Sequence, residues 1–210
     1  LEVPIPESHP LAPINPYGWS KRMMEQIFAD CRNAWGLEAV ALRYFNAAGA
    51  EASGRTGEWH RPETHLLPVA LRAAMQNGAP MKVFGADYPT KDGTCVRDYI
   101  HVSDLAEAHK LALEHLLDGG TSEVFNLGSE EGFTVLEILG AIKTITGLQV
   151  PYEPAPRREG DPASLVASSA KIRRLLNWQR KFSSPEQIVK DAYAWHSRMG
   201  FEGGPSHSQR

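Results

Sequence analysis

The chain has 210 residues, of which 42% are hydrophobic and 22% are charged. These proportions are ordinary for a globular protein and exclude collagen-like and disordered classes. The 22 basic and 25 acidic residues give a net charge of −3. That balance gives no support to binding of nucleic acid or of an anionic membrane, since both need a basic surface. No apolar run approaches the ~18 residues of a transmembrane helix.

The cysteine content indicates a reducing environment. Cys31 and Cys95 are the two cysteines of the chain, too few for a disulfide framework or a cysteine-based zinc site. We therefore expect a cytoplasmic protein with no metal. The chain begins with Leu1 in a proline-rich stretch, and we expect it to be part of a longer protein.

The first third of the sequence predicts a helix, a strand and a loop. Asn15-Pro16 is a typical helix start, because asparagine caps free N–H groups and proline suits the first turn. The helix is expected over 17–35, a buried strand of a parallel sheet over 39–45 and a loop over 46–62. The spacing of four and three residues predicts an inner helix face of Tyr17, Lys21, Met24, Phe28 and Cys31.

The rest of the sequence alternates helices with short strands, which favours an α/β fold. Ser103 or Asp104 is expected to cap the third helix, and Thr134 the fourth. Residues 149–166 are expected to be irregular with short extended pieces, and 201–210 to form a frayed tail. Helices are expected over 63–77, 103–117, 135–146, 168–176 and 185–199, and strands over 81–85, 95–102 and 123–128.

Tyr17 and Lys21 form a Tyr-x-x-x-Lys pair. On a helix, residues four apart lie on one face with Cβ atoms about 5–6 Å apart. The lysine ammonium would favour the phenolate, which is the form that acts as a general base. A surface lysine beside an aromatic ring is the alternative interpretation of this spacing.

Six motifs occur in a fixed order, and the first of them contains this pair. They are NPYGWSK, LRYFNAAG (42–49), THLLP (64–68), VFGADYPTKDGTCVRDYIHVSDLAEAH (83–109), FNLGSEEGFTVLEI (125–138) and RREGDPASLVASSAK (157–171). In this order the chain resembles the UDP-glucose 4-epimerase family of extended short-chain dehydrogenase/reductases, from about residue 3 to residue 200.

The resemblance implies the C-terminal part of a Rossmann-type parallel sheet plus the smaller mixed α/β substrate-binding domain. Residues 1–48 would be the remainder of the NAD-binding domain, with a return strand near 123–128, and 49–200 mainly the UDP-sugar-binding domain. The family's Gly-x-x-Gly-x-x-Gly turn, which places the dinucleotide pyrophosphate at a helix N-terminus, does not occur in these 210 residues. We therefore expect the chain by itself to bind NAD weakly.

The resemblance assigns residues to the hexose and the nicotinamide. Tyr17 would be the general base, and Lys21 its electrostatic partner and a ligand of the nicotinamide ribose. Phe45 would lie beside the nicotinamide, and Asn46 would contact the UDP-sugar. Leu165 falls where family members vary between tyrosine and smaller residues, a position that gates access of N-acetyl sugars.

The nucleoside half of the substrate is assigned in the same way. Lys82, Val83 and Phe84 would clamp the uracil with backbone hydrogen bonds and an aromatic surface. Asp161 would accept a hydrogen bond from a ribose hydroxyl. From the residues alone, 82–84 could equally be an ordinary edge strand.

The diphosphate and the sugar have their own expected contacts. Arg97 and Arg158 would hold the diphosphate, for which the planar guanidinium fork is suited. An ion pair with Asp98 is the alternative role of Arg97. His65 and Leu66 fall where the family contacts the sugar or the phosphates.

The implied reaction interconverts UDP-glucose and UDP-galactose by transient, NAD-dependent oxidation at C4 of the hexose. Two alternatives stay open: an epimerase of another UDP-sugar (pentose, uronate or N-acetylhexosamine), and a non-catalytic UDP-sugar-binding fragment. A homodimer is possible through the helix face of Met23, Ile27 and Cys31, although that face could also belong to an intrachain core.

Overall fold

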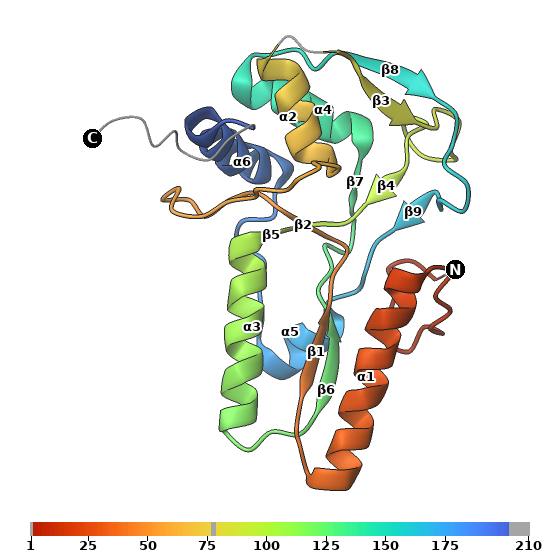
Figure 1. Cartoon of the computed structure of the whole chain (residues 1–210), viewed down its shortest axis with the longest axis vertical. Helices are drawn as coiled ribbons and strands as arrows, with labels where there is room; N and C mark the ends of the chain where they lie inside the picture. The colour runs from red at the N-terminus through yellow and green to blue at the C-terminus, as the bar shows by residue number, and fades with distance from the viewer. Residues whose placement is uncertain (1, 77–78, 202–210) are drawn as a thin grey trace.

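A computed structural model describes residues 2–76 and 79–201 as two lobes joined by short crossing strands (Figure 1). The first lobe contains α1 (Pro16–Trp35), β1 (Val40–Arg43), α3 (Val102–Leu117), β6 (Glu123–Asn126) and α5 (Ala170–Leu176). The second contains α2 (Leu66–Met75), β3 (Met81–Phe84), α4 (Val135–Thr146), β8 (Tyr152–Ala155) and α6 (Pro185–Met199). Between them lie β2 (Asn46–Ala48), β4 (Val96–Arg97), β5 (Tyr99–His101), β7 (Phe133–Thr134) and β9 (Ser164–Leu165).

The strand pairs are mostly parallel, which confirms the predicted α/β class. β1 pairs with β6, β2 with β5, and β3 with β8, each in parallel. The three-stranded sheet has the order β7-β4-β9, with β7 antiparallel and β9 parallel to β4. Parallel pairing places the carboxyl ends of β1 and β6 together, which is where ligands bind in such folds.

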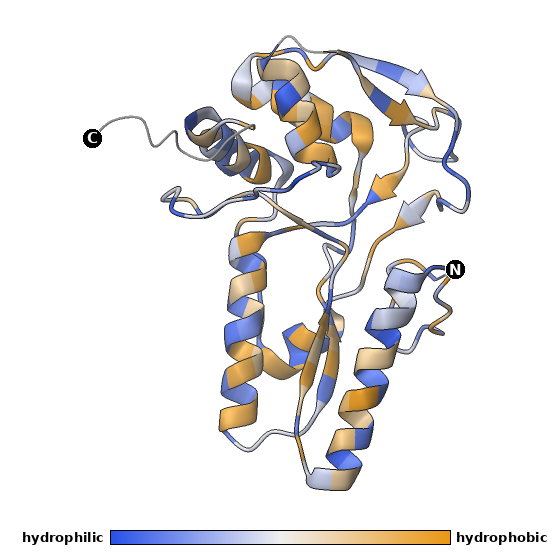
Figure 2. Cartoon of the chain, in the orientation of Figure 1, coloured by the Kyte–Doolittle hydropathy of each residue, from blue (hydrophilic) through white to orange (hydrophobic). Residues whose placement is uncertain are grey.

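Two separate hydrophobic cores stabilise the lobes. One is built on α2, α4 and α6, and includes the buried residues Leu71, Ile142 and Ile188. The other lies between β1, β6, α3 and α5, with Phe125 and Trp178 at its centre. Apolar colour in Figure 2 runs along the helix faces that meet in these cores. No helix within residues 2–76 and 79–201 combines the length and apolar character that a bilayer crossing demands.

Helix α1 has the predicted bounds but not the predicted burial. Asn15 caps it by accepting from the Gly18 N–H at 2.8 Å, and Gly36 ends it in the left-handed conformation. No residue of α1 is buried. Tyr17 is 72% exposed and Met24 47%, so the predicted inner face is wrong for these positions. The cause is the narrow β1–β6 sheet, since two strands cover little of a 20-residue helix.

Local capping signals were predicted well for α4 and poorly for α3. Thr134 and Glu137 form a complete capping box at the start of α4. The expected cap of α3, Ser103 or Asp104, is wrong: the His101 side chain accepts from the Ser103 N–H instead. Asp104 is directed elsewhere, because it accepts from the backbone N–H groups of Lys181 and Phe182.

The predicted strand 95–102 is interrupted at Asp98, which separates β4 from β5. The Asp98 side chain is fully buried and accepts from the backbone N–H groups of Ser129 and Ala167 at 2.8–3.1 Å. A Cβ on Gly128 would lie 1.7 Å from the Ala167 carbonyl oxygen. Glycine is therefore required where these two segments pass each other.

Two further expectations need correction. The predicted loop 46–62 begins with strand β2, which the alanine- and glycine-rich sequence concealed. Strand β7 was not expected, because two residues carry no periodic signal. Most of the expected frayed tail, 202–210, lies outside the described residues.

We predict that Asp98→Asn lowers the free energy of unfolding by about 2–3 kcal/mol, since the new amide NH₂ would face a backbone N–H donor and leave it unpaired. Urea denaturation followed by circular dichroism measures the change. Asp118→Asn, at an exposed site, is the control and should stay within about 0.5 kcal/mol of the parent. Equal losses in both variants would contradict the role given to Asp98.

The pH dependence of the free energy of unfolding provides a second test of the role of Asp98. Burial raises the pKa of Asp98, more than its hydrogen bonds lower it. The native protein then keeps a proton where the unfolded chain has lost it. The contribution of Asp98 protonation to the free energy of unfolding is complete below the usual aspartate pKa of about 3.9. This contribution is lost as pH rises through the native pKa. Asp98→Asn should remove this part of the pH dependence.

Candidate active site

Tyr17 and Lys21 lie one helical turn apart near the start of α1, as the spacing predicted. The Lys21 Nζ lies 5.2 Å from the centre of the Tyr17 ring. Tyr17 is largely exposed, so the phenol is accessible to a ligand. The asparagine cap and Pro16 define where the helix begins, and they therefore fix the position of Tyr17 in its first turn.

A cavity of about 430 Å³ opens at the carboxyl end of β1. Four of the predicted site residues line it: Phe45, Asn46, His65 and Leu66. The Asn46 side chain donates to the Asp98 carbonyl oxygen at 2.8 Å, which fixes its amide at the cavity wall. The structure thus brings together residues that lie about 20 positions apart in the sequence.

Tyr99 also lines this cavity and was not expected there. It is 5% exposed, and burial raises its pKa well above the usual range. Its phenol therefore stays protonated. Tyr99 can offer a hydrogen bond but cannot serve as the general base, a role for which the exposed Tyr17 is the better candidate.

Arg97 is paired, but with Asp161 and not with the neighbouring Asp98. Its Nη2 lies 2.5 Å from the Asp161 Oδ1, and its Nη1 donates to the carbonyl oxygens of Val96 and Pro162. The Nε–H and one Nη2–H have no hydrogen-bond partner within residues 2–76 and 79–201. These two groups remain available for an anion.

The expected uracil and diphosphate contacts meet at β3. Phe84 stacks with Arg158, whose guanidinium carbon lies 4.1 Å from the ring centre. Val83 is buried while Lys82 is exposed, as expected where β3 pairs with β8. The stack leaves the Arg158 fork beside an aromatic surface, which is a suitable environment for a base and a phosphate.

Leu165 lies on β9, directly opposite Arg97 in the parallel pairing. It is half-buried and belongs to the same short sheet as Arg97. The predicted site residues therefore form four groups: the Tyr17–Lys21 pair, the cavity at β1, the β4–β9 group and the Phe84–Arg158 stack. Tyr17 does not line the cavity at β1.

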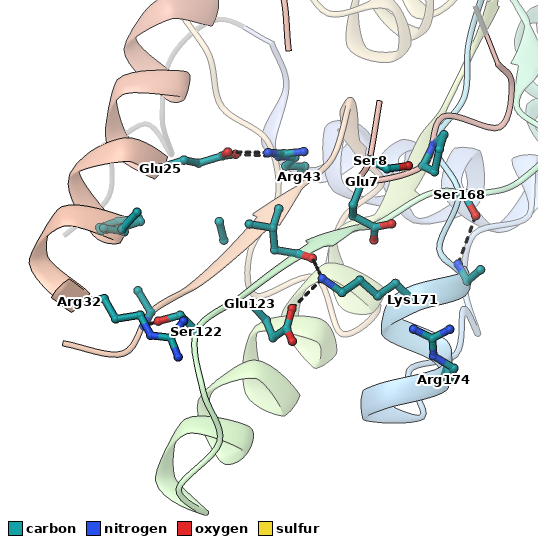
Figure 3. A pocket seen from close by; sticks show the side chains of 17 residues that line it. Glu7, Ser8, Glu25, Arg32, Arg43, Ser122, Glu123, Ser168, Lys171 and Arg174 are labelled. Atoms are coloured by element: carbon teal, nitrogen blue, oxygen red, sulfur yellow. Dashed lines mark hydrogen bonds and ion pairs between the residues drawn. The ribbon is translucent and has the colours of Figure 1, made fainter. Parts of the chain in front are cut away.

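A second cavity of about 720 Å³ lies between α1, the β1–β6 sheet and α5 (Figure 3). Its charged side chains are largely neutralised by one another: Arg43 pairs with Glu25, and Lys171 with Glu123 at 2.6 Å. None of the predicted site residues lines it. This gap beside the sheet is therefore a poorer candidate for the substrate site.

The residues that the resemblance assigns to NAD are those expected at its nicotinamide end. Tyr17 and Lys21 are exposed on α1, and Phe45 is half-exposed at the carboxyl end of β1. This is a suitable set for a ribose and a flat ring, because it combines hydrogen-bonding groups with an aromatic face. The pyrophosphate cradle that the resemblance leads one to expect does not occur in the 210-residue sequence.

The structure thus has an α/β fold with a Tyr–Lys pair in the first turns of α1. Comparison with known proteins agrees: residues 2–128 match the NAD dependent epimerase/dehydratase family. The chain belongs to this family.

The relatives cover almost the whole chain. UDP-glucose 4-epimerase of Halalkalibacterium halodurans is 51% identical over 93% of the chain. The structure of UDP-glucose 4-epimerase from Brucella ovis with NAD matches with a TM-score of 0.90 and 45% identity over 92% of the chain. The enzyme from Bifidobacterium longum with NAD+ and UDP matches at 0.85 and 37% over 93%. The chain spans 59–60% of the length of these relatives.

Proposed function

We propose that this chain is the Tyr–Lys and UDP-sugar-binding portion of an NAD-dependent UDP-glucose 4-epimerase, acting in galactose metabolism in the cytoplasm. The observation that carries the proposal is the 51% identity to such an enzyme across 93% of the chain. The geometry supports it, because the structure contains a Tyr–Lys pair, an arginine with free donors and an arginine stacked on an aromatic ring.

Different residues of this chain would act on the hexose and on the diphosphate of the substrate. When bound, NAD supplies reversible transfer of hydride at C4 of the hexose. Tyr17 would take the proton of the C4 hydroxyl and return it, with Lys21 stabilising the phenolate. Arg97 and Arg158 would hold the diphosphate by charge-assisted hydrogen bonds.

The cavity at β1 is suited to a sugar that must turn over between the two hydride transfers. Nine of its fifteen lining residues are apolar or glycine: Phe45, Ala47, Ala48, Gly49, Gly57, Leu66, Leu67, Pro68 and Val102. Such walls offer few directional hydrogen bonds. Strong contacts at the diphosphate and weak contacts at the hexose would let the sugar present either face.

Among the alternative substrates, a UDP-uronate is the least supported. The lining of this cavity includes no lysine or arginine to neutralise a sugar carboxylate. UDP-pentoses and UDP-N-acetylhexosamines are the remaining alternatives, and Leu165 bears on the second of them. A homodimer is a further part of the proposal, supported by the exposure of Met23 and Ile27 on α1.

In the complete enzyme, Tyr17→Phe should lower kcat by about 10²–10⁴-fold, the usual contribution of a general acid–base group. UDP affinity should hardly change, because the phenol addresses the hexose. Steady-state kinetics and calorimetric UDP titration measure the two effects. Tyr152→Phe, on β8, is the matched control with full activity. A comparable loss of UDP binding in Tyr17→Phe would show that Tyr17 lies at the nucleotide.

Arg97→Ala and Arg158→Ala should each weaken UDP binding by about 1.5–3 kcal/mol, because a charge-assisted contact to the diphosphate is removed. Calorimetry with UDP alone gives the number. Arg157→Ala is the control: this neighbour pairs with Asp87 at 2.8 Å and stacks on Tyr88. Unchanged UDP affinity in Arg97→Ala and Arg158→Ala would show that both arginines have a structural role only.

Leu165 should filter substrates by size at the sugar 2-position. We expect Leu165→Tyr to lower any activity on UDP-N-acetyl sugars strongly and to spare UDP-galactose, whereas Leu165→Cys should raise the N-acetyl activity. Steric selection by a few atoms is worth about 1–3 kcal/mol, so kcat/KM ratios should shift by no more than a few hundredfold. Unchanged ratios in both variants would remove Leu165 from the sugar pocket.

A further inference from the structure

A cluster of histidine and glutamate side chains lies just ahead of α2, in the segment His60-Arg61-Pro62-Glu63-Thr64-His65. Ligand atoms of His60, Glu63 and His65 all lie within 4.8 Å of one another. Nδ1 of His60 is 3.9 Å from the Glu63 Oε1, and Nδ1 of His65 is 3.7 Å from the same oxygen. Glu58 contributes a second carboxylate, hydrogen-bonded to the His65 Nδ1.

We propose that these four residues form a binding site for a divalent transition metal of the Zn²⁺ class. Two imidazoles and two carboxylates are a donor set that Zn²⁺ accepts, whereas Ca²⁺ and Mg²⁺ require oxygen ligands. Four-coordinate zinc with bonds of about 2.0–2.2 Å separates its ligand atoms by roughly 3.3 Å. The two Nδ1–Oε1 separations to Glu63 exceed this by about 0.4 and 0.6 Å, whereas the hydrogen-bonded Glu58 and His65 lie closer and would separate to admit the ion.

The carboxylates are held in place by the backbone around them. The Glu63 Oε1 accepts from the N–H groups of Thr64 and His65, both at 2.7 Å, and its side chain is only 10% exposed. The Glu58 carbonyl accepts from the Trp195 indole N–H at 2.9 Å, which ties this segment to α6. Preorganised ligands of this kind lower the cost of metal binding.

The two histidines supply adjustable ligands and an entry path. Their rings are stacked, with centres 5.1 Å apart and planes within 8°. Both side chains are at least half exposed, at 50% for His60 and 57% for His65, so each can turn toward a shared ion. With neutral imidazoles the four ligands carry a charge of −2, which one divalent cation would balance.

The position of the cluster relates the metal site to the cavity at β1. Glu58 and His65 also line the 430 Å³ cavity at β1. A metal here would therefore sit at the rim of that cavity and share a wall with it. The metal-site inference does not rest on the proposed reaction, because its evidence is the ligand geometry alone.

Titration of the metal-free 210-residue chain with Co²⁺ and then Zn²⁺ tests the proposal. We expect one Co²⁺ per chain with the intense visible absorption of a four-coordinate ion, displaced by one equivalent of Zn²⁺. His60→Asn should weaken Zn²⁺ binding at least about tenfold. Glu63→Gln should do the same while keeping an oxygen that can accept the two backbone hydrogen bonds.

His115→Asn is the matched control, because this histidine bonds to the Thr121 carbonyl and belongs to no such cluster among the described residues. It should bind Zn²⁺ like the parent chain, and circular dichroism should show that all variants are folded. Absence of the visible bands at one equivalent of Co²⁺ would overturn the proposal. Equal Zn²⁺ affinity in the parent, His60→Asn and Glu63→Gln would overturn it as well and leave a hydrogen-bonded cluster only.

Discussion

The buried Asp98 is the constraint on which the placement of every site group at the lobe junction depends. Its carboxylate accepts from Ser129 and Ala167, and its carbonyl accepts from Asn46. Four chain segments that are remote in sequence are thereby joined at one residue. A buried carboxylate is costly unless its oxygens are hydrogen-bonded. That cost makes any other arrangement of these segments unfavourable, and so gives the crossing a single geometry.

The consequence for the site follows from chain connectivity. Arg97 and Tyr99 flank Asp98, and their Cα atoms can be at most about 7 Å apart. Arg97 belongs to the group with Asp161 and Leu165, whereas Tyr99 lines the cavity with Asn46. An anion contact and an apolar sugar-sized cavity are therefore held next to each other by one buried side chain. In the proposed reaction, the anion contact would bind the diphosphate and the cavity would hold the hexose.

Local signals in the sequence predicted most of the elements, because caps and helix starts depend on residues within four positions. Asn15 and Thr134 cap their helices as expected. Partners across the fold could not be predicted in this way. Proximity in sequence suggested Asp98 as the partner of Arg97. Two backbone N–H donors, of Ser129 and Ala167, hold the Asp98 carboxylate in the interior instead, and Asp161 takes the ion pair. The clustering of His60 with its neighbours was missed for a related reason, since a short loop has no periodicity from which side-chain directions can be inferred.

Helix α1 shows how the proposed general base, Tyr17, can be positioned without a core beneath it. No residue of α1 is buried, but Glu25 and Arg43 form a bidentate, partly buried pair that ties the helix to β1. Glu25 lies eight residues after Tyr17, or about 12 Å along the helix axis, and Arg43 lies two residues before Phe45. A planar two-bond contact restricts rotation as well as distance. An ion pair therefore sets the orientation of the Tyr17 phenol relative to the carboxyl end of β1. A hydrophobic contact of the same area would define this orientation less sharply.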